Sequence, residues 1–243
     1  MSERHWRPAL ATTALALLGT AAVAGCGASS SSTTAASSTA HAGVAAAAGQ
    51  NAFTAAQLKD ALLTEISGEK PAAAPESGAY GTLPDVQTSR ATMKNVKVSP
   101  AVCAEASQTG FNSAAFTDAP ASVVTFRVGK DGVSEVLVAA DSSLAADALA
   151  NHLPAGCNHY DATVDGKTFR YSVKQSTVSG LADKARALNV EAAGYSDVDV
   201  WSVVYQGSGF VGAVTIVGPN ATKKGVEKLA ADSYAYASQS LSS

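Results

Sequence analysis

The sequence has few of the residues that usually build a large hydrophobic core. Aromatic residues make up 6% of the 243 residues and charged residues 15%, and the hydrophobic fraction of 47% includes 51 alanines. Because alanine contributes little buried area, we expect a smaller core than the hydrophobic fraction suggests. The formal net charge of −3 lacks the basic excess that nucleic-acid binding requires, so nucleic acid is not an expected partner.

Cysteine is also scarce, and long apolar runs are missing from most of the sequence. Three cysteines are too few for a small disulfide-rich scaffold. After residue 26, no apolar run approaches the roughly 20 residues that a membrane-spanning helix needs. We therefore expect one globular domain whose membrane attachment, if any, lies at its N-terminus.

The N-terminus has the pattern of a bacterial secretion signal. Arg4 and Arg7 form a basic start, and an apolar or small stretch follows from residue 9 to residue 25. The stretch ends in Val23-Ala24-Gly25-Cys26, which resembles the lipobox of bacterial lipoproteins. That resemblance implies cleavage before Cys26 and attachment of acyl chains to this residue. An ordinary signal peptide and an uncleaved single span are the alternatives.

These features divide the chain into three segments. Residues 1–25 are the expected lipoprotein signal peptide, and residues 26–51 are the lipidated cysteine and a flexible tether rich in Ala, Ser and Thr. A segment of this composition cannot bury enough apolar surface to offset its ordering entropy. Residues 52–243 are the expected globular domain. We therefore expect a protein held by its lipid on the extracytoplasmic face of the cell membrane.

The globular segment begins and ends with helix signals. Thr54 and Gln57 match a capping box before a helix expected over 55–67. The three prolines in 69–92 indicate a long loop. Further helices are expected at three places: after Ser99-Pro100 through Cys103, over 143–152, and after Asn220 to the C-terminus.

Hairpin signals lie between these helices. Segments rich in β-branched and aromatic residues alternate with turn residues such as Asp165-Gly166. We therefore predict a single-domain α+β fold, with flanking helices and a mostly antiparallel sheet of five to seven strands. The expected strands are 123–128, 133–138, 160–164, 167–178, 188–192, 198–206 and 210–217.

Cys103 and Cys157 are the two cysteines of the globular segment. Outside the cytoplasm such a pair favours a disulfide, which would close a loop of about 55 residues and stabilise the fold by roughly 4 kcal/mol. A metal site is the alternative, because His152, Cys157 and His159 lie close together in the sequence. With Cys103 as a fourth ligand, this set suits zinc or copper. No cofactor is otherwise expected.

Trp201, Tyr205 and Phe210 are the candidate ligand-binding residues, because aromatic side chains on a sheet can line an apolar pocket. They could equally fill core space that the alanines leave empty. An apolar cavity beside Trp201 and Tyr205 would indicate a small ligand, whereas a flat, well-filled sheet would indicate a protein partner.

Two patterns that can indicate enzymes lack the necessary context. Residues 207–212 match G-x-G-x-x-G, but strand residues follow where a dinucleotide site needs a helix. We expect a hairpin turn and a close strand contact there instead. The histidines offer no clear nucleophile and base pair for a hydrolase, so an enzyme is not expected.

The lipobox, the tether, the Ser99-Pro100-x-x-Cys103 step and the position of Cys157 after an Ala-rich helix together resemble actinobacterial envelope lipoproteins. Among these, the layout of about residues 53–240 is most similar to the extracellular sensor domain of mycobacterial PknH-type kinases. The resemblance implies an antiparallel sheet, flanked by helices, with a cleft for an unidentified ligand. That family typically has two disulfides, of which this chain can form one.

These observations lead to one expected function and one alternative. We expect a non-enzymatic ligand-binding or sensor-like domain, anchored to the membrane through the lipid on Cys26. Its partner would be a small molecule, an envelope component or an envelope protein. The alternative is an envelope metal-binding protein that uses the Cys/His cluster.

Overall fold

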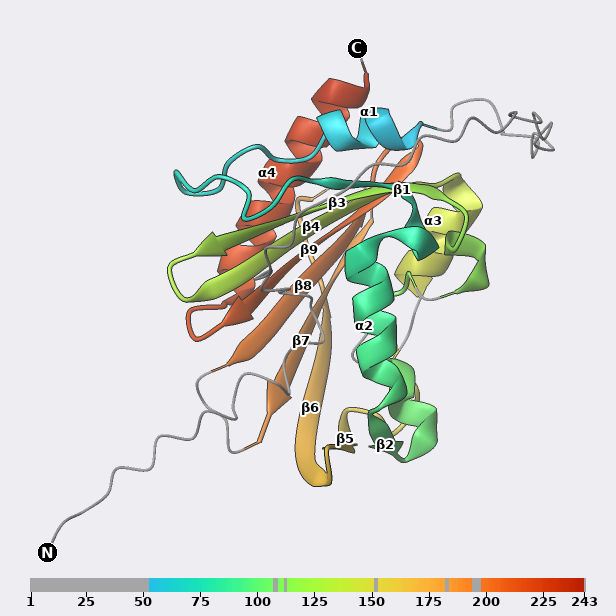
Figure 1. The fold of residues 1–243 in the computed structure, drawn as a ribbon, viewed down its shortest axis with the longest axis vertical. Helices are drawn as coiled ribbons and strands as arrows, with labels where there is room; N and C mark the ends of the chain where they lie inside the picture. Colours follow the sequence, from blue (N-terminus) through green and yellow to red (C-terminus); the bar gives the residue numbers. More distant parts are fainter. Residues whose placement is uncertain are drawn as a thin grey trace, which may run out of the picture.

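The structure is a computed structural model, and it describes residues 53–106, 109–111, 113–150, 153–181, 184–193 and 198–242. Within these residues, nine strands form one antiparallel sheet, and four α-helices and three short 3₁₀ helices surround it (Figure 1). The strand order is β1-β3-β4-β9-β8-β7-β6-β5-β2. The predicted α+β class and antiparallel sheet are therefore confirmed.

The strands are β1 (Glu76–Ala79), β2 (Lys97–Ser99), β3 (Pro120–Val128), β4 (Asp131–Ala139), β5 (His159–Val164), β6 (Lys167–Thr177), β7 (Ala185–Ala192), β8 (Asp199–Gln206) and β9 (Phe210–Gly218). The α-helices are α1 (Ala55–Asp60), α2 (Pro84–Lys94), α3 (Ser142–Ala150) and α4 (Lys223–Leu241). The 3₁₀ helices are η1 (Tyr80–Thr82), η2 (Ala101–Glu105) and η3 (Ala114–Phe116).

The predicted count of five to seven strands is wrong, because β1 and β2 add two strands at the edges of the sheet. β1 has four residues and β2 three, and each pairs with one neighbour only. Strands this short do not show the alternation that identifies longer strands in a sequence. Short edge strands also limit unwanted pairing with other chains.

α2 lies inside the segment predicted to be a loop. Pro84 occupies its first turn, and its N-cap, Leu83, makes no side-chain capping bond. Instead, the Glu76 carboxylate of β1 accepts a hydrogen bond of 3.0 Å from the Asp85 backbone N–H. Because the cap comes from another element, a search for local capping residues cannot find it.

Other helix boundaries differ less from expectation. α1 has the predicted capping box between Thr54 and Gln57 but ends at Asp60, short of the expected residue 67. α4 is capped by Thr222, whose side chain accepts from the Gly225 N–H, and not by Asn220. The Asn220 backbone N–H donates instead to the Asp131 carboxylate, 3.1 Å away.

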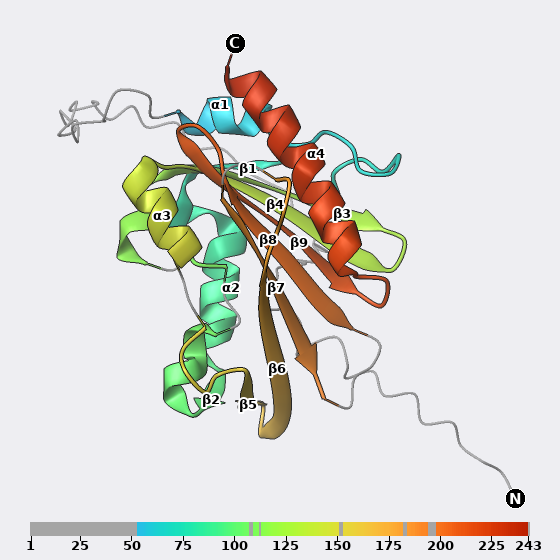
Figure 2. The same cartoon turned by 180° about the vertical axis from the view of Figure 1, so that it is seen from behind.

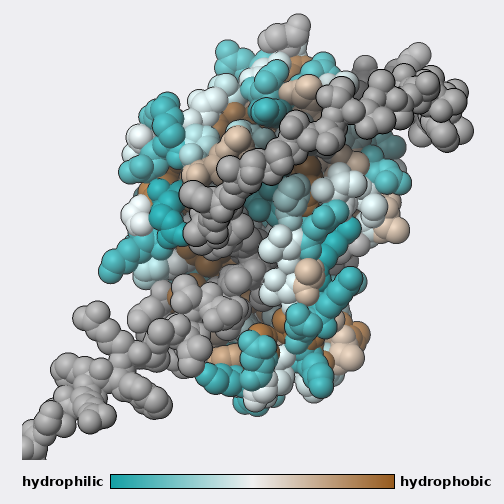
Figure 3. Space-filling view, in the orientation of Figure 1, coloured by the Kyte–Doolittle hydropathy of each residue, from teal (hydrophilic) through white to brown (hydrophobic). Residues whose placement is uncertain are grey.

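Helices cover the two faces of the sheet differently. On the face called here the α4 face, α1 and α4 pack over Leu137, Val203 and Val214. Figure 2 shows α4 across this face, with β6 and β7 extending beyond it. On the opposite face, called here the disulfide face, α3 and the η2 segment cover two further clusters. α2 has no buried residue, and the surface over it is mostly hydrophilic or neutral (Figure 3).

The G-x-G-x-x-G segment forms the turn and close contact that its sequence context predicts. β8 ends at Gln206 and β9 starts at Phe210, so the first two glycines lie in the hairpin turn. Gly209 has a φ of +79°, which favours glycine. Gly212 lies opposite Tyr205, and a Cβ atom there would be 2.3 Å from the Tyr205 ring. The third glycine therefore lets a buried tyrosine lie across the neighbouring strand.

A Gly212→Ala variant should lower the free energy of unfolding by about 1–3 kcal/mol, because the added methyl group overlaps a buried ring. Urea unfolding of the purified chain would measure this change. Gly132→Ala is the matched control on β4, where the nearest atom, the Val217 carbonyl oxygen, is 4.0 Å from the added Cβ. Equal stability of the two variants would contradict the prediction.

Candidate functional site

A buried carboxyl group lies at the centre of the α4 face. Glu135 of β4 has no solvent exposure, and its register partners on β3 and β9 are Val124 and Val214. The Ser233 hydroxyl of α4 donates to Oε1 at 2.5 Å. The Leu63 backbone N–H, just after α1, donates to Oε2 at 2.8 Å. The carboxyl group therefore bonds to both of the helical segments that cover this face.

Tyr205 extends this polar cluster to β8. Its hydroxyl lies 2.5 Å from the Ser233 Oγ atom, and its ring is fully buried. Because Ser233 donates its proton to Glu135, the Tyr205 hydroxyl is the donor to Ser233. The arrangement is a hydrogen-bonded chain from a phenol through a hydroxyl to a carboxylate, inside an otherwise apolar layer.

Burial controls the acidity of both end groups of this chain. Loss of hydration raises the pKa of Glu135 to about 7, although hydrogen bonds from Ser233 and Leu63 partly oppose the change. Burial and the nearby Glu135 carboxylate raise the pKa of Tyr205 well above its usual value. Among the described residues, no lysine, arginine or histidine forms an ion pair with Glu135. The carboxyl group thus changes charge near neutral pH without a cation beside it.

The sequence contains two signs of this cluster that the choice of candidate residues missed. Glu135 stands between Val133 and Leu137 on the apolar side of a strand. Ser233 is the polar residue within the apolar stripe of the last helix. A polar residue that interrupts an apolar pattern in each of two elements indicates a buried hydrogen-bonded pair.

The three aromatic candidates lie in different surroundings. Tyr205 and Phe210 are buried in the core, and their rings pack edge to face, 6.4 Å apart. Trp201 is partly buried and packs against the same core. In this conformation Tyr205 and Phe210 fill core space, so Trp201 alone of the three offers surface to a partner.

A group of polar side chains lies next to Trp201, on the part of the α4 face that the helix α4 does not cover. These side chains belong to β6, β7 and β8. Asn189 lies opposite Trp201, and Glu191 lies opposite Asp199 on the neighbouring strand. Lys174 of β6 pairs with Glu191 at 3.4 Å. Burial and the neighbouring Glu191 raise the pKa of Asp199, and Lys174 partly opposes the change. This group of five residues, in which Asn189 is buried and the other four are exposed or partly exposed, is called here the Trp201 surface.

The disulfide face contains a buried cation near the end of α3. Arg186 of β7 is 9% exposed, and its guanidinium donates to the carbonyl oxygens of Ala148 and Thr109. Burial lowers the pKa of Arg186 to about 10. Backbone carbonyls thus replace a carboxylate partner and attach α3 and the segment at Thr109 to the sheet.

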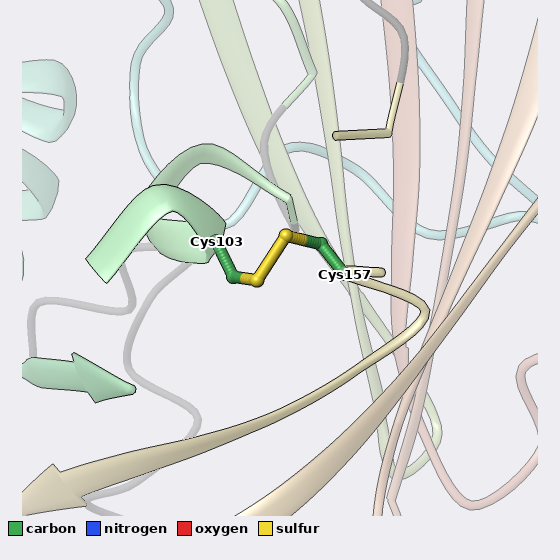
Figure 4. Close-up of a disulfide and its surroundings, with 2 residues drawn as sticks. All are labelled: Cys103 and Cys157. Atoms are coloured by element: carbon green, nitrogen blue, oxygen red, sulfur yellow. A yellow bond between two sulfur atoms is a disulfide. The ribbon is translucent and has the colours of Figure 1, made fainter. Parts of the chain in front are cut away.

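The disulfide predicted from the sequence is present. Cys103 of η2 and Cys157, just before β5, form a bond with 5.3 Å between their Cα atoms (Figure 4). Both cysteines are fully buried against Tyr160, Tyr171 and other residues of the β5 to β7 region. The bond therefore attaches η2 to the part of the sheet farthest from α1 and α4.

The alternative metal site does not form from these side chains. The Cys157 sulfur belongs to the disulfide, so it is not a free thiolate ligand. His159 is exposed on β5, and His152 lies outside the described residues. The described part of the chain contains no group of three or more potential metal ligands. Cys26, the predicted lipidation site, also lies outside the described residues.

Comparison with known proteins identifies the fold. No protein-family model and no curated protein sequence matches the chain. The extracellular domain of PknH from Mycobacterium tuberculosis matches with a TM-score of 0.51 and 14% identity, over 80% of this chain and 99% of that domain. An uncharacterized protein of Mycobacterium smegmatis (Rv0999 ortholog) matches with a TM-score of 0.44 and 16% identity, over 78% and 98% of the two chains.

The match to the PknH domain confirms, at the level of the fold, the resemblance to the PknH-type extracellular domain. Identities this low extend the similarity to the fold alone. Among the described residues, no helix is long and apolar enough to cross a membrane.

Stability should depend on pH through Glu135. Its pKa rises from 4.5 in the unfolded chain to about 7 in the folded state, so folding favours the protonated form. The free energy of unfolding should therefore fall between about pH 4.5 and pH 7, by up to roughly 3 kcal/mol. Urea unfolding at pH 5 and pH 8 measures the slope. Glu135→Gln should remove this contribution, whereas Glu105→Gln, an exposed control, should keep it. Equal slopes in both variants would contradict the assignment.

Removal of the disulfide should destabilise the domain. The bond joins residues 54 positions apart, so a Cys103→Ala/Cys157→Ala variant should lose about 2–4 kcal/mol of unfolding free energy. The measurement is urea unfolding of oxidised wild type and of the double variant under the same conditions. Unchanged stability of the variant would show that the bond contributes nothing to the fold.

Proposed function

We propose that this chain is a membrane-anchored extracytoplasmic lipoprotein whose globular domain is a non-enzymatic, ligand-binding or sensor-like domain. The observation that carries the proposal is the shared fold with the extracellular domain of PknH, over 99% of that domain. The disulfide between Cys103 and Cys157 supports an oxidising compartment.

The attachment proposed is a lipid on Cys26. The sequence Val23-Ala24-Gly25-Cys26 after an apolar stretch supports it. In this proposal residues 1–25 are removed, and residues 26–51 form the tether. A flexible chain of that length spans on the order of 25–30 Å, so residues 52–243 would stand clear of the lipid headgroups.

The proposed binding region is the Trp201 surface. Tyr205 and Phe210 pack into the core, whereas Trp201 is partly exposed on the same side of the sheet as Lys174, Glu191 and Asp199, which are exposed or partly exposed. An extended sheet surface of this kind supports an envelope protein or another large envelope component as partner more than a small apolar molecule. A tryptophan with an apolar ring and a polar N–H suits the centre of such an interface.

The anchor is tested by changing the proposed lipidation site. Cys26→Ser should abolish incorporation of an alkyne-labelled palmitate in an actinobacterial host and move the protein out of the membrane fraction. The Cys103→Ala/Cys157→Ala variant is the control, because it changes two other cysteines and should keep the label. Label retained by Cys26→Ser would overturn the anchor.

The binding surface is tested by photo-crosslinking in intact cells. A benzoylphenylalanine at Lys174, on the Trp201 surface, should give a crosslinked product that Trp201→Ala abolishes. The same residue at Lys228, on the outer side of α4, is the control. Both lysines are exposed and each pairs with one carboxylate. Equal products at both positions, or a product unaffected by Trp201→Ala, would contradict this assignment.

A further inference from the structure

Glu135 connects elements that are far apart in the chain. It accepts hydrogen bonds from Leu63, 72 residues before it, and from Ser233, 98 residues after it. Leu63 belongs to the stretch called here the α1 segment, residues 55–66. This segment begins four residues after the end of the predicted tether, residues 26–51.

The surroundings of Glu135 offer little compensation for a negative charge. Its register partners are two valines, and α1 contributes apolar side chains such as Leu58 and Leu62. Tyr205 on β8 is the one titratable side chain of the described residues that faces it through Ser233. Among the described residues, an ionised carboxylate here has two hydrogen bonds but no cation to offset the cost of its burial.

Within the described residues, the other side-chain hydrogen bonds from the sheet to the α1 segment come from groups that do not titrate. The Ala55 carbonyl accepts from the hydroxyl groups of Ser77 and Ser122, which stay neutral. The Leu63 bond to Glu135 is thus the contact whose partner changes charge near neutrality.

The α1 segment is the shorter of the two helical segments that bond to Glu135. α1 has six helical residues, whereas α4 has nineteen and buries five of them against the sheet. Opening this segment exposes Leu58, Ala61, Leu62 and Ile66 and gives the carboxylate access to water, while α4 stays on the sheet.

We propose that protonated Glu135 holds the α1 segment on the sheet and that loss of this proton loosens the segment, so that external acidity controls the element nearest the membrane anchor. The location of this response outside the membrane rests on the proposed function. The response itself depends only on the contacts of Glu135.

Hydrogen exchange of the full chain in detergent, at pH 5.5 and pH 8.5, tests the proposal directly. Exchange times are scaled for the intrinsic pH dependence of amide exchange. With a pKa of about 7 in the closed state and 4.5 in the open state, amides of the α1 segment should lose about 30-fold protection at the higher pH. Peptides from α4 should change far less. Unchanged protection of the α1 segment would overturn the proposal.

Two substitutions distinguish the titration of Glu135 from the titration of other groups. Glu135→Gln keeps an acceptor for the Leu63 N–H and should make protection of the α1 segment independent of pH. Glu105→Gln, which is exposed on η2, should behave as wild type. If the pH dependence survives in Glu135→Gln, another group is responsible and the proposal fails.

A direct titration keeps the test valid if Glu135→Gln does not fold. In the wild-type chain, ¹³C NMR of labelled glutamate carboxyls should show one midpoint near 7. Ser233→Ala should raise that midpoint, because the serine hydrogen bond favours the charged form. Ordinary midpoints for every glutamate would overturn the proposal. None of these measurements needs a lipid or a ligand. A negative result would therefore overturn the pH response of the α1 segment without testing the proposed function.

Discussion

The main constraint on this molecule is that few large apolar side chains must cover a nine-stranded sheet. Aromatic residues are 6% of the sequence, and alanine occupies many helix positions that face the sheet. The chain covers the α4 face with α1 and α4 over the central strands β4, β9 and β8. The opposite face has smaller clusters, held in addition by the disulfide and by the buried Arg186. The polar Trp201 surface lies where helical cover of the α4 face ends.

Much of the fold could be predicted from local sequence patterns. The elements that could not be predicted depend on contacts between distant parts of the chain. The long strands, the capping box of α1, the hairpin at residues 207–212 and the disulfide all have signals within a few residues or in the pairing of two cysteines. α2 was missed because Glu76, nine residues away on another element, supplies its cap. β1 and β2 were missed because three or four residues on an edge need their neighbour to be recognised.

The residues of the candidate site were likewise predictable by type but not by their contacts with other elements. Aromaticity identified Trp201, Tyr205 and Phe210, but a sequence cannot say which of them faces the core. The ring of Tyr205 points inward because Gly212 leaves space for it on the next strand. Glu135 and Ser233 belong to β4 and α4, 98 residues apart, so their hydrogen bond appears only when both elements are packed together.

The order of elements along the chain also has a mechanical consequence. α1 is the first described element, and it lies beside the C-terminal end of α4 in both ribbon views (Figures 1 and 2). Tension applied from the N-terminal side therefore acts on a six-residue helix before it reaches any strand. Such a load would detach α1 from β1 and β3 while the hydrogen bonds of the central strands stay intact. The central sheet is in this way insulated from a load applied at the N-terminal end of the domain.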